Sequence, residues 1–63
     1  MKKIELERRK ADLTQQQLAE LVGVTSGAVS KWEQGVTIPR SDRLVIVADV
    51  LGVKVEDLIG DAE

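Results

Sequence analysis

The sequence predicts an all-α fold, a compact single domain of five short helices that spans residues 1–63. Two observations lead to this prediction. Apolar residues recur at spacings of three and four along the chain, which is the period of an amphipathic helix. Glycine, proline and capping residues separate these segments, as expected where helices begin and end. A chain this short buries only about 60% of its unfolded surface, so packing between helices must hold the fold.

The first helix is expected over residues 2–11. Ile4, Arg8 and Ala11 share one face at spacings of four and three, so this face should turn toward the core. Asp12 should end the helix, because aspartate tolerates the left-handed conformation better than most residues.

The next two helices have clear boundary signals. Thr14 is a good N-cap for the second helix, with Gln17 three residues later completing a capping box. This helix should end before Gly23. Thr25 should cap the third helix, which ends at Gly35, since glycine is favoured just after a helix C-terminus.

The fourth helix should follow the loop 36–40, with Ser41 as its N-cap and Asp42 in its first turn, where negative charge suits the helix dipole. Its predicted core face is Leu44, Val47, Ala48 and Leu51, and Gly52 ends it. A fifth short helix is expected over residues 55–59. Four apolar residues of this last segment should cover the core: Val53, Val55, Leu58 and Ile59.

Residues 15–34, QQQLAELVGVTSGAVSKWEQ, carry the most specific pattern in the chain. Two helices that cross steeply through a short turn need a small side chain where they touch, and Ala19 supplies it. Gly23 accepts the positive φ that the turn requires. Val29 and Trp32 should anchor the later helix on the core. This arrangement is typical of a helix-turn-helix, whose second helix enters the DNA major groove.

The third helix should turn a small polar face outward, made of Ser26, Gly27, Ser30 and Lys31. The hydroxyls can donate or accept hydrogen bonds, and Lys31 can reach a guanine edge or a phosphate. Gly27 costs about 1 kcal/mol relative to alanine in a helix interior, which close approach to DNA would offset. The alternative is that a glycine is simply tolerated in the first turn. With few side chains suited to bidentate bonds, readout should depend more on DNA shape.

Two stretches, LTQQQLAELVGVTSGAVSKWEQG and ADVLGVKVEDLIG, resemble the lambda-repressor-like (XRE-type) family of phage repressors, Cro proteins and small bacterial regulators. The resemblance covers roughly Ile4 to Gly60. It implies that Ser26, Gly27 and Lys31 face bases, and we add Ser30 to them. The DNA-backbone and phosphate candidates that it implies are Gln15, Thr25, Gln34, Thr37, Arg40 and Arg43. Gln16 is added as a phosphate candidate, the alternative being that it is only a surface residue of the second helix.

Arg8 lies on the predicted buried face of the first helix, where a guanidinium needs an acceptor. Glu33, at the end of the third helix, is the expected partner, and members of the family that this chain resembles carry such an Arg–Glu pair. We expect the pair to have a structural role.

The fourth helix has more apolar residues than its core face needs, and exposed apolar clusters often mark interfaces. The loop VTIPR is also less basic than that of several phage relatives, which predicts modest affinity of one monomer and favours a homodimer on two half-sites. The candidates for its interface are Val45, Ile46, Val50, Val53 and Val55. The alternative is that the last helix covers them all.

Charge and composition narrow the function classes. The net charge of −2 speaks mildly against nucleic acid, but the acidic excess lies in residues 44–63, with one basic and five acidic residues. The chain has neither cysteine nor histidine, so we expect no enzyme, metal site or cofactor. We find no signal peptide and no apolar run of about 20 residues that would span a bilayer. We therefore expect a cytoplasmic protein of a bacterium or phage-infected cell, with no membrane or small-molecule partner.

The leading hypothesis is a sequence-specific regulator of transcription that binds double-stranded DNA, acting as a repressor on a palindromic operator as a dimer. The alternative is a protein-interaction module of the same fold, such as an antitoxin or co-regulator, with little direct DNA binding. The acidic end and the apolar loop favour this alternative slightly.

Overall fold

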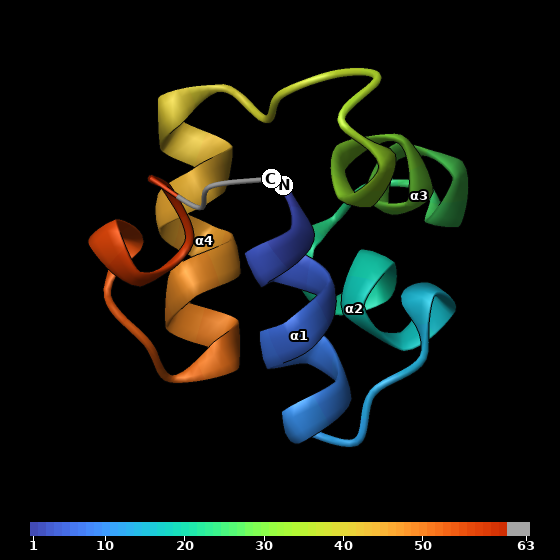
Figure 1. Cartoon of the computed structure of the whole chain (residues 1–63). Coiled ribbons are helices and arrows are strands. Elements are labelled where there is room, and N and C mark those ends of the chain that lie inside the picture. Colours follow the sequence, from blue (N-terminus) through green and yellow to red (C-terminus); the bar gives the residue numbers. More distant parts are fainter. Residues whose placement is uncertain (61–63) are drawn as a thin grey trace.

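The computed structural model describes residues 1–60, which form four α-helices and a final 3-10 turn (Figure 1). The elements are α1 (Lys2–Lys10), α2 (Gln15–Val22), α3 (Ser26–Gln34), α4 (Ser41–Leu51) and the 3-10 turn η1 (Val55–Asp57). No strand occurs within residues 1–60, so the all-α prediction is confirmed for them. Two residues of the predicted acidic end, Asp61 and Glu63, lie outside the described part of the chain.

The prediction of five helices is wrong, because the segment after Gly52 forms one 3-10 turn instead of a fifth α-helix. Its backbone hydrogen bonds join residues three positions apart. The Asp57 amide donates to the Lys54 carbonyl and the Leu58 amide to the Val55 carbonyl, both at 2.9 Å. The segment is only seven residues long between Gly52 and Gly60, both at positive φ, which is too short for a stable α-helix, and 3-10 turns are common as such short connectors.

The predicted boundaries of α2 and α3 are confirmed by their caps. The Thr14 hydroxyl accepts from the Gln17 amide at 3.0 Å, and the Gln17 side chain accepts from the Thr14 amide at 2.9 Å, which completes the capping box. The Thr25 hydroxyl accepts from the Ala28 amide at 3.1 Å. Gly23, with φ of 87°, makes the turn between the two helices.

Two boundary predictions are wrong. Arg40 instead of Ser41 is the N-cap of α4, and its side chain makes no capping bond. Asp42 supplies the local acceptor instead, since its carboxylate accepts from the Arg43 amide at 2.9 Å. Ala11 is exposed because α1 ends at Lys10, so it does not continue the buried face of Ile4 and Arg8. The left-handed conformation predicted for Asp12 is present, with φ of 62°.

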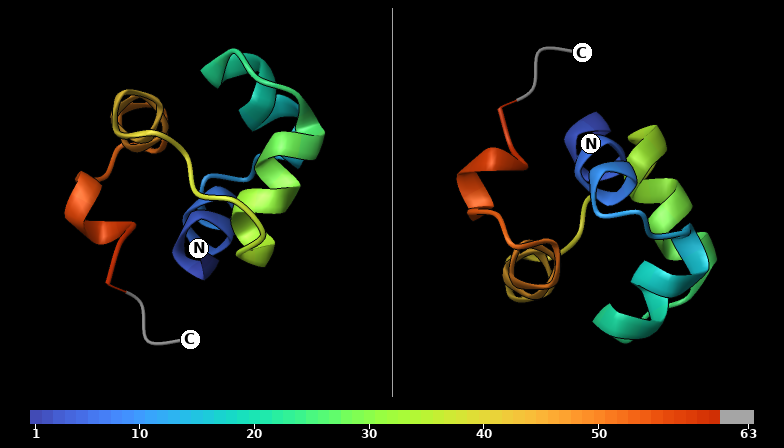
Figure 2. Two further views of the ribbon diagram at one scale, coloured as in Figure 1. Left: turned by 90° about the horizontal axis from the view of Figure 1, so that it is seen from above. Right: turned by 90° about the horizontal axis from the view of Figure 1, so that it is seen from below.

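The helices pack around one core. The α2–α3 pair lies on one side of the molecule and α4 with η1 on the other, and both views of Figure 2 show α1 beside α3. α2 packs on α4, so α2 joins the α2–α3 side of the molecule to the side formed by α4 and η1. The buried apolar residues are Ile4, Leu18, Ala19, Val22, Val29, Trp32, Leu44, Val47, Ala48 and Leu58.

The last segment contributes less to this core than the sequence predicts. Leu58 is fully buried, and Val53 and Val55 are half-buried against the core. Ile59 is exposed, so its predicted place in the core is wrong. Among residues 1–60, no helix has the length and apolar character needed to cross a bilayer.

Candidate nucleic-acid interface

α3 presents one polar strip to solvent because two apolar residues hold its opposite face. Val29 and Trp32 are buried in the core, three residues apart. Residues spaced by three, four and seven positions share one face of a helix, and on α3 such a set lies opposite Val29 and Trp32. The strip defined in this way is Gly27, Ser30, Lys31 and Gln34, all exposed except Ser30, which is half-buried. We call these four residues the α3 strip.

Gln34 lies on this strip, although sequence reasoning placed it among the phosphate candidates. Its side-chain amide donates to the Ser30 hydroxyl at 2.9 Å, so the two polar groups act together. The seven-residue spacing from Gly27 to Gln34 is the sequence signal that indicates this position. Ser26 is the first residue of α3 and half-buried, at the margin of the strip.

A hydrogen-bonded network joins the start of α2 and the end of α3 to α1. The Arg8 guanidinium donates to both oxygens of Glu33, from Nε at 2.7 Å and from Nη2 at 3.2 Å, so the structure brings together the residues of the expected ion pair. Arg8 Nη1 also donates to the Leu13 carbonyl at 2.8 Å. The hydrogen bond with Glu33 raises the pKa of Arg8 further above its ordinary value, against the effect of burial, so its charge is permanent.

Gln15 joins the same network. Its side-chain Nε2 donates to Glu33 Oε1 at 3.0 Å, although 18 positions separate the two residues. Gln15 is half-buried and begins α2, whereas its neighbour Gln16 is exposed and donates to Glu20 at 3.1 Å within the same helix. Sequence reasoning identified Gln15 as a phosphate candidate but gave no indication of this contact.

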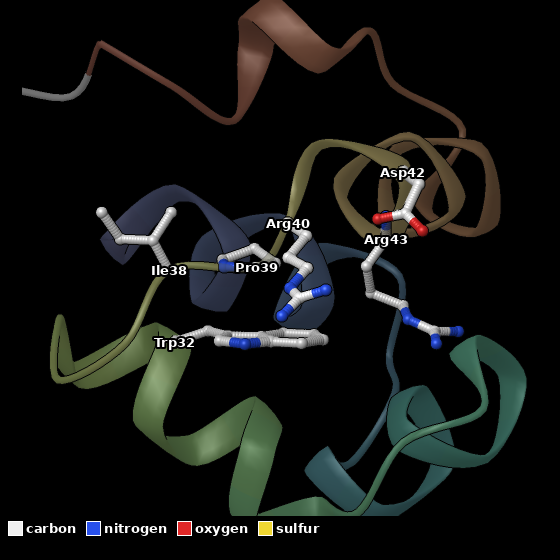
Figure 3. Close-up of a pocket in the computed structure, with 6 residues that line it drawn as sticks. All are labelled: Trp32, Ile38, Pro39, Arg40, Asp42 and Arg43. Carbon is white, nitrogen blue, oxygen red and sulfur yellow. The ribbon is translucent and has the colours of Figure 1, made fainter.

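Arg40, the N-cap of α4, and Arg43 line an open hollow of about 390 Å³ between the end of α3 and the start of α4 (Figure 3). Its lining residues are Trp32, Ile38, Pro39, Arg40, Asp42 and Arg43. The figure shows the Arg40 guanidinium turned toward the indole of Trp32. Arg43 extends toward α2, where its Nη1 donates to the Val22 carbonyl at 2.8 Å. Arg43 thereby holds the last turn of α2, a role that sequence reasoning missed because the two residues are far apart in the chain.

Two further cations of α1, Arg9 and Lys10, are paired with acidic residues on its surface. Arg9 donates to Glu5 at 2.8 Å, and Lys10 lies 3.5 Å from Glu7. Exposed ion pairs of this kind are weak and contribute little free energy to the fold. No cluster of three acidic, histidine or cysteine side chains able to hold a metal ion occurs among the described residues.

The sequence model of the helix-turn-helix family matches residues 4–58. The chain belongs to the XRE-type helix-turn-helix family. The resemblance inferred from the two sequence stretches is thereby confirmed, and members of this family are DNA-binding transcription regulators.

Two relatives of this helix-turn-helix domain regulate transcription in opposite directions. It is 34% identical over 61 residues to the HTH-type transcriptional activator BcrR of Enterococcus faecalis, covering 97% of this chain and 30% of the activator. It is 32% identical over 54 residues to the cryptic phage CTXphi transcriptional repressor RstR of Vibrio cholerae, covering 86% of this chain and 48% of the repressor. The chain thus spans less than half of either relative. No solved structure matches it.

The other predicted residues of this helix-turn-helix domain are the two threonines expected at the DNA backbone and the residues expected at a dimer interface. Thr25 is the exposed N-cap of α3, and Thr37 is exposed in the loop, with its amide 3.4 Å from the Lys31 carbonyl. Of the predicted interface residues, Val45 and Ile46 are exposed on α4. The other three, Val50, Val53 and Val55, are half-buried against the core, which leaves a smaller apolar surface than the sequence suggests.

Proposed function

We propose that this domain binds double-stranded DNA in a sequence-specific manner, with α3 in the major groove, and regulates transcription. The observation that carries this proposal is the α3 strip, which is exposed to solvent while Val29 and Trp32 fix the helix from behind. Serine, glutamine and lysine side chains on such a strip can bond to base edges. Ser26, Gly27, Ser30 and Lys31 are the proposed base-facing residues, and we add Gln34 to them.

The proposed backbone contacts surround this strip. Gln15 and Gln16 begin α2, Thr25 caps α3, and Thr37 and Arg40 lie beyond its C-terminal end. Arg43 keeps further N–H donors beside the one that holds Val22, so we retain it as a weaker phosphate candidate. Contacts to phosphates fix the orientation of a protein on the duplex, whereas base contacts select the sequence.

We further propose that the domain acts as a homodimer on a palindromic operator and represses by covering it. Two copies related by two-fold symmetry would read half-sites about 34 Å apart, one turn of the double helix. Val45 and Ile46, exposed on α4, are the first candidates for the contact between copies, with Val50, Val53 and Val55 at its edge. Sedimentation with and without operator tests this step, and a strict monomer in both conditions would contradict it.

The decisive test of DNA reading is selection of bound sequences from a random DNA pool, followed by titration against salt. Replacing Lys31 by glutamine should weaken binding to the selected duplex and reduce the slope of log K against log salt by about one if Lys31 contacts a phosphate. If Lys31 instead contacts a guanine, the selected sequence should change at one position. Measurement of binding at several salt concentrations detects the first result, and a selection repeated with the variant detects the second.

Lys54→Gln provides the matched control, because Lys54 is exposed at the start of η1, on the other side of the molecule from α2 and α3. It makes the same change in net charge. Equal losses in the two variants would mean that only overall charge matters, and would contradict a reading role for Lys31.

Gly27→Ala separates the two explanations for the glycine. A Cβ at this position would meet only the Thr25 hydroxyl, at 3.8 Å, so the free protein has room for it. We expect the unfolding free energy to rise by about 0.4–1 kcal/mol, because alanine restricts the unfolded chain. If Gly27 lies close to DNA, affinity should fall at the same time. Unfolding and binding measured on one preparation test both expectations, and unchanged affinity would favour the explanation that glycine is merely tolerated.

A protein-interaction module is the second candidate, favoured by the loop before α4. Val36 and Ile38 are 63% and 75% exposed, more than the other large apolar residues described. Exposed apolar groups close together often contact a protein partner. If the domain shows no salt-dependent DNA binding and is indifferent to Lys31→Gln and Gln15→Ala, this second function is the better account.

A further inference from the structure

We propose that Glu33 is a positioning residue for a phosphate contact made by Gln15: its buried carboxylate fixes the side-chain amide of Gln15 so that one N–H is kept for DNA. This inference rests on the proposed DNA-binding function, because it describes how one contact of that function is prepared.

The carboxylate of Glu33 is itself held in place. Its two oxygens accept from Arg8 Nε at 2.7 Å and from Arg8 Nη2 at 3.2 Å. Its side chain is only 4% exposed, and that of Arg8 10%. Arg8 is fixed in turn by the Leu13 carbonyl, 2.8 Å from Nη1. Glu33 therefore presents a rigid acceptor to the start of α2.

This acceptor determines which way the Gln15 amide faces. A carboxylate only accepts hydrogen bonds, so Nε2 of Gln15 and not its oxygen must lie against Glu33, as the 3.0 Å contact has it. Nε2 carries two hydrogens, and Glu33 takes one of them. A phosphate oxygen also only accepts, so the second hydrogen is the group suited to it. The opposite orientation would present the amide oxygen to two anionic acceptors.

The position of Gln15 allows it to serve both partners. It is half-buried, so one side of the amide contacts Glu33 while the residue keeps access to solvent at the N-terminus of α2. A glutamine left without such a partner must lose rotamer freedom when it binds, and ordering it beforehand removes this cost. Gln16 is the contrast, because its amide is held only by the exposed Glu20 of the same helix.

Affinity for DNA measured in two backgrounds tests the inference. One background is the wild type, and the other is Arg8→Met/Glu33→Leu, which removes both buried charges and leaves neither unpaired. The probe is a duplex that carries the sequence selected from the random pool. In the wild type, Gln15→Ala should weaken binding about tenfold, as expected for a hydrogen bond to a charged group. In the apolar background the same change should weaken it less than about threefold, since an unpositioned amide contributes less.

Gln16→Ala is the matched control and should have the same effect in both backgrounds. An equal loss from Gln15→Ala in the two backgrounds overturns this inference alone. A wild-type protein that binds no duplex in a salt-dependent way overturns the proposed function together with it.

Nuclear magnetic relaxation of the glutamine side-chain amides in the free wild type gives a second measurement that does not depend on the apolar background folding. The Gln15 signal, assigned by its loss in Gln15→Ala, should be more ordered than that of Gln16. A Gln15 amide as mobile as that of Gln16 overturns the inference.

Discussion

Replacing Glu33 by glutamine should lower the free energy of unfolding by about 3–5 kcal/mol, the largest effect that we expect from a single polar substitution. The variant leaves the charge of Arg8 uncompensated in a site where both side chains are at most 10% exposed. It also weakens the acceptor that Gln15 and Arg8 share at Glu33 Oε1. A protein of this length has a total stability of roughly 3–9 kcal/mol, at about 0.05–0.15 kcal/mol per residue, so the variant should be largely unfolded on modest heating.

Urea titration followed by the fluorescence of Trp32 measures this loss, because Trp32 is the only aromatic residue and is buried in the core. Glu5→Gln is the control, since Glu5 pairs with Arg9 on the exposed surface of α1, and it should change stability by less than about 1 kcal/mol. The double variant Arg8→Met/Glu33→Leu should recover most of the loss. If Glu33→Gln were as stable as Glu5→Gln, the buried pair would contribute little to the fold.

The features that could be predicted from sequence are those set within a few residues. The caps at Thr14 and Thr25 are bonds to amides three residues away, and the turn at Gly23 depends on one residue's access to positive φ. The buried positions of Val29 and Trp32 follow from helical period. These local rules define the α2–α3 unit, and with it the face that the domain turns toward DNA in the proposed function.

Contacts between distant parts of the chain are harder to predict, because helical period gives the direction of a side chain and not its partner. The predicted burial of Arg8 and the family resemblance together predict its ion pair with Glu33. By contrast, the family resemblance assigns Gln15 and Arg43 to phosphates. The structure shows that one also contacts Glu33 and the other the Val22 carbonyl, 21 positions away. A long polar side chain at a helix start can reach a neighbouring helix as easily as a ligand.

The prediction for the last segment is wrong for a different reason, namely the helical period of that segment. On an α-helix, residues 55, 58 and 59 share a face, so the sequence predicts that both Leu58 and Ile59 are buried. A 3-10 turn has three residues per turn, which places residue 58 directly over residue 55 and turns residue 59 away. In the structure Leu58 is fully buried, whereas Ile59 is 45% exposed.

The second large effect should therefore come from Leu58→Ala, with Ile59→Ala as its matched neighbour. Leu58 closes the core from outside the four helices, so its truncation should lower the unfolding free energy by about 2–5 kcal/mol. Ile59→Ala should cost less than about 1 kcal/mol, because the side chain keeps much of its contact with water. Urea titration of both variants decides the point. Equal losses at the two positions would mean that the segment is an α-helix in solution with both residues on the core, and a small loss from Leu58→Ala would mean that η1 is not part of the folded unit.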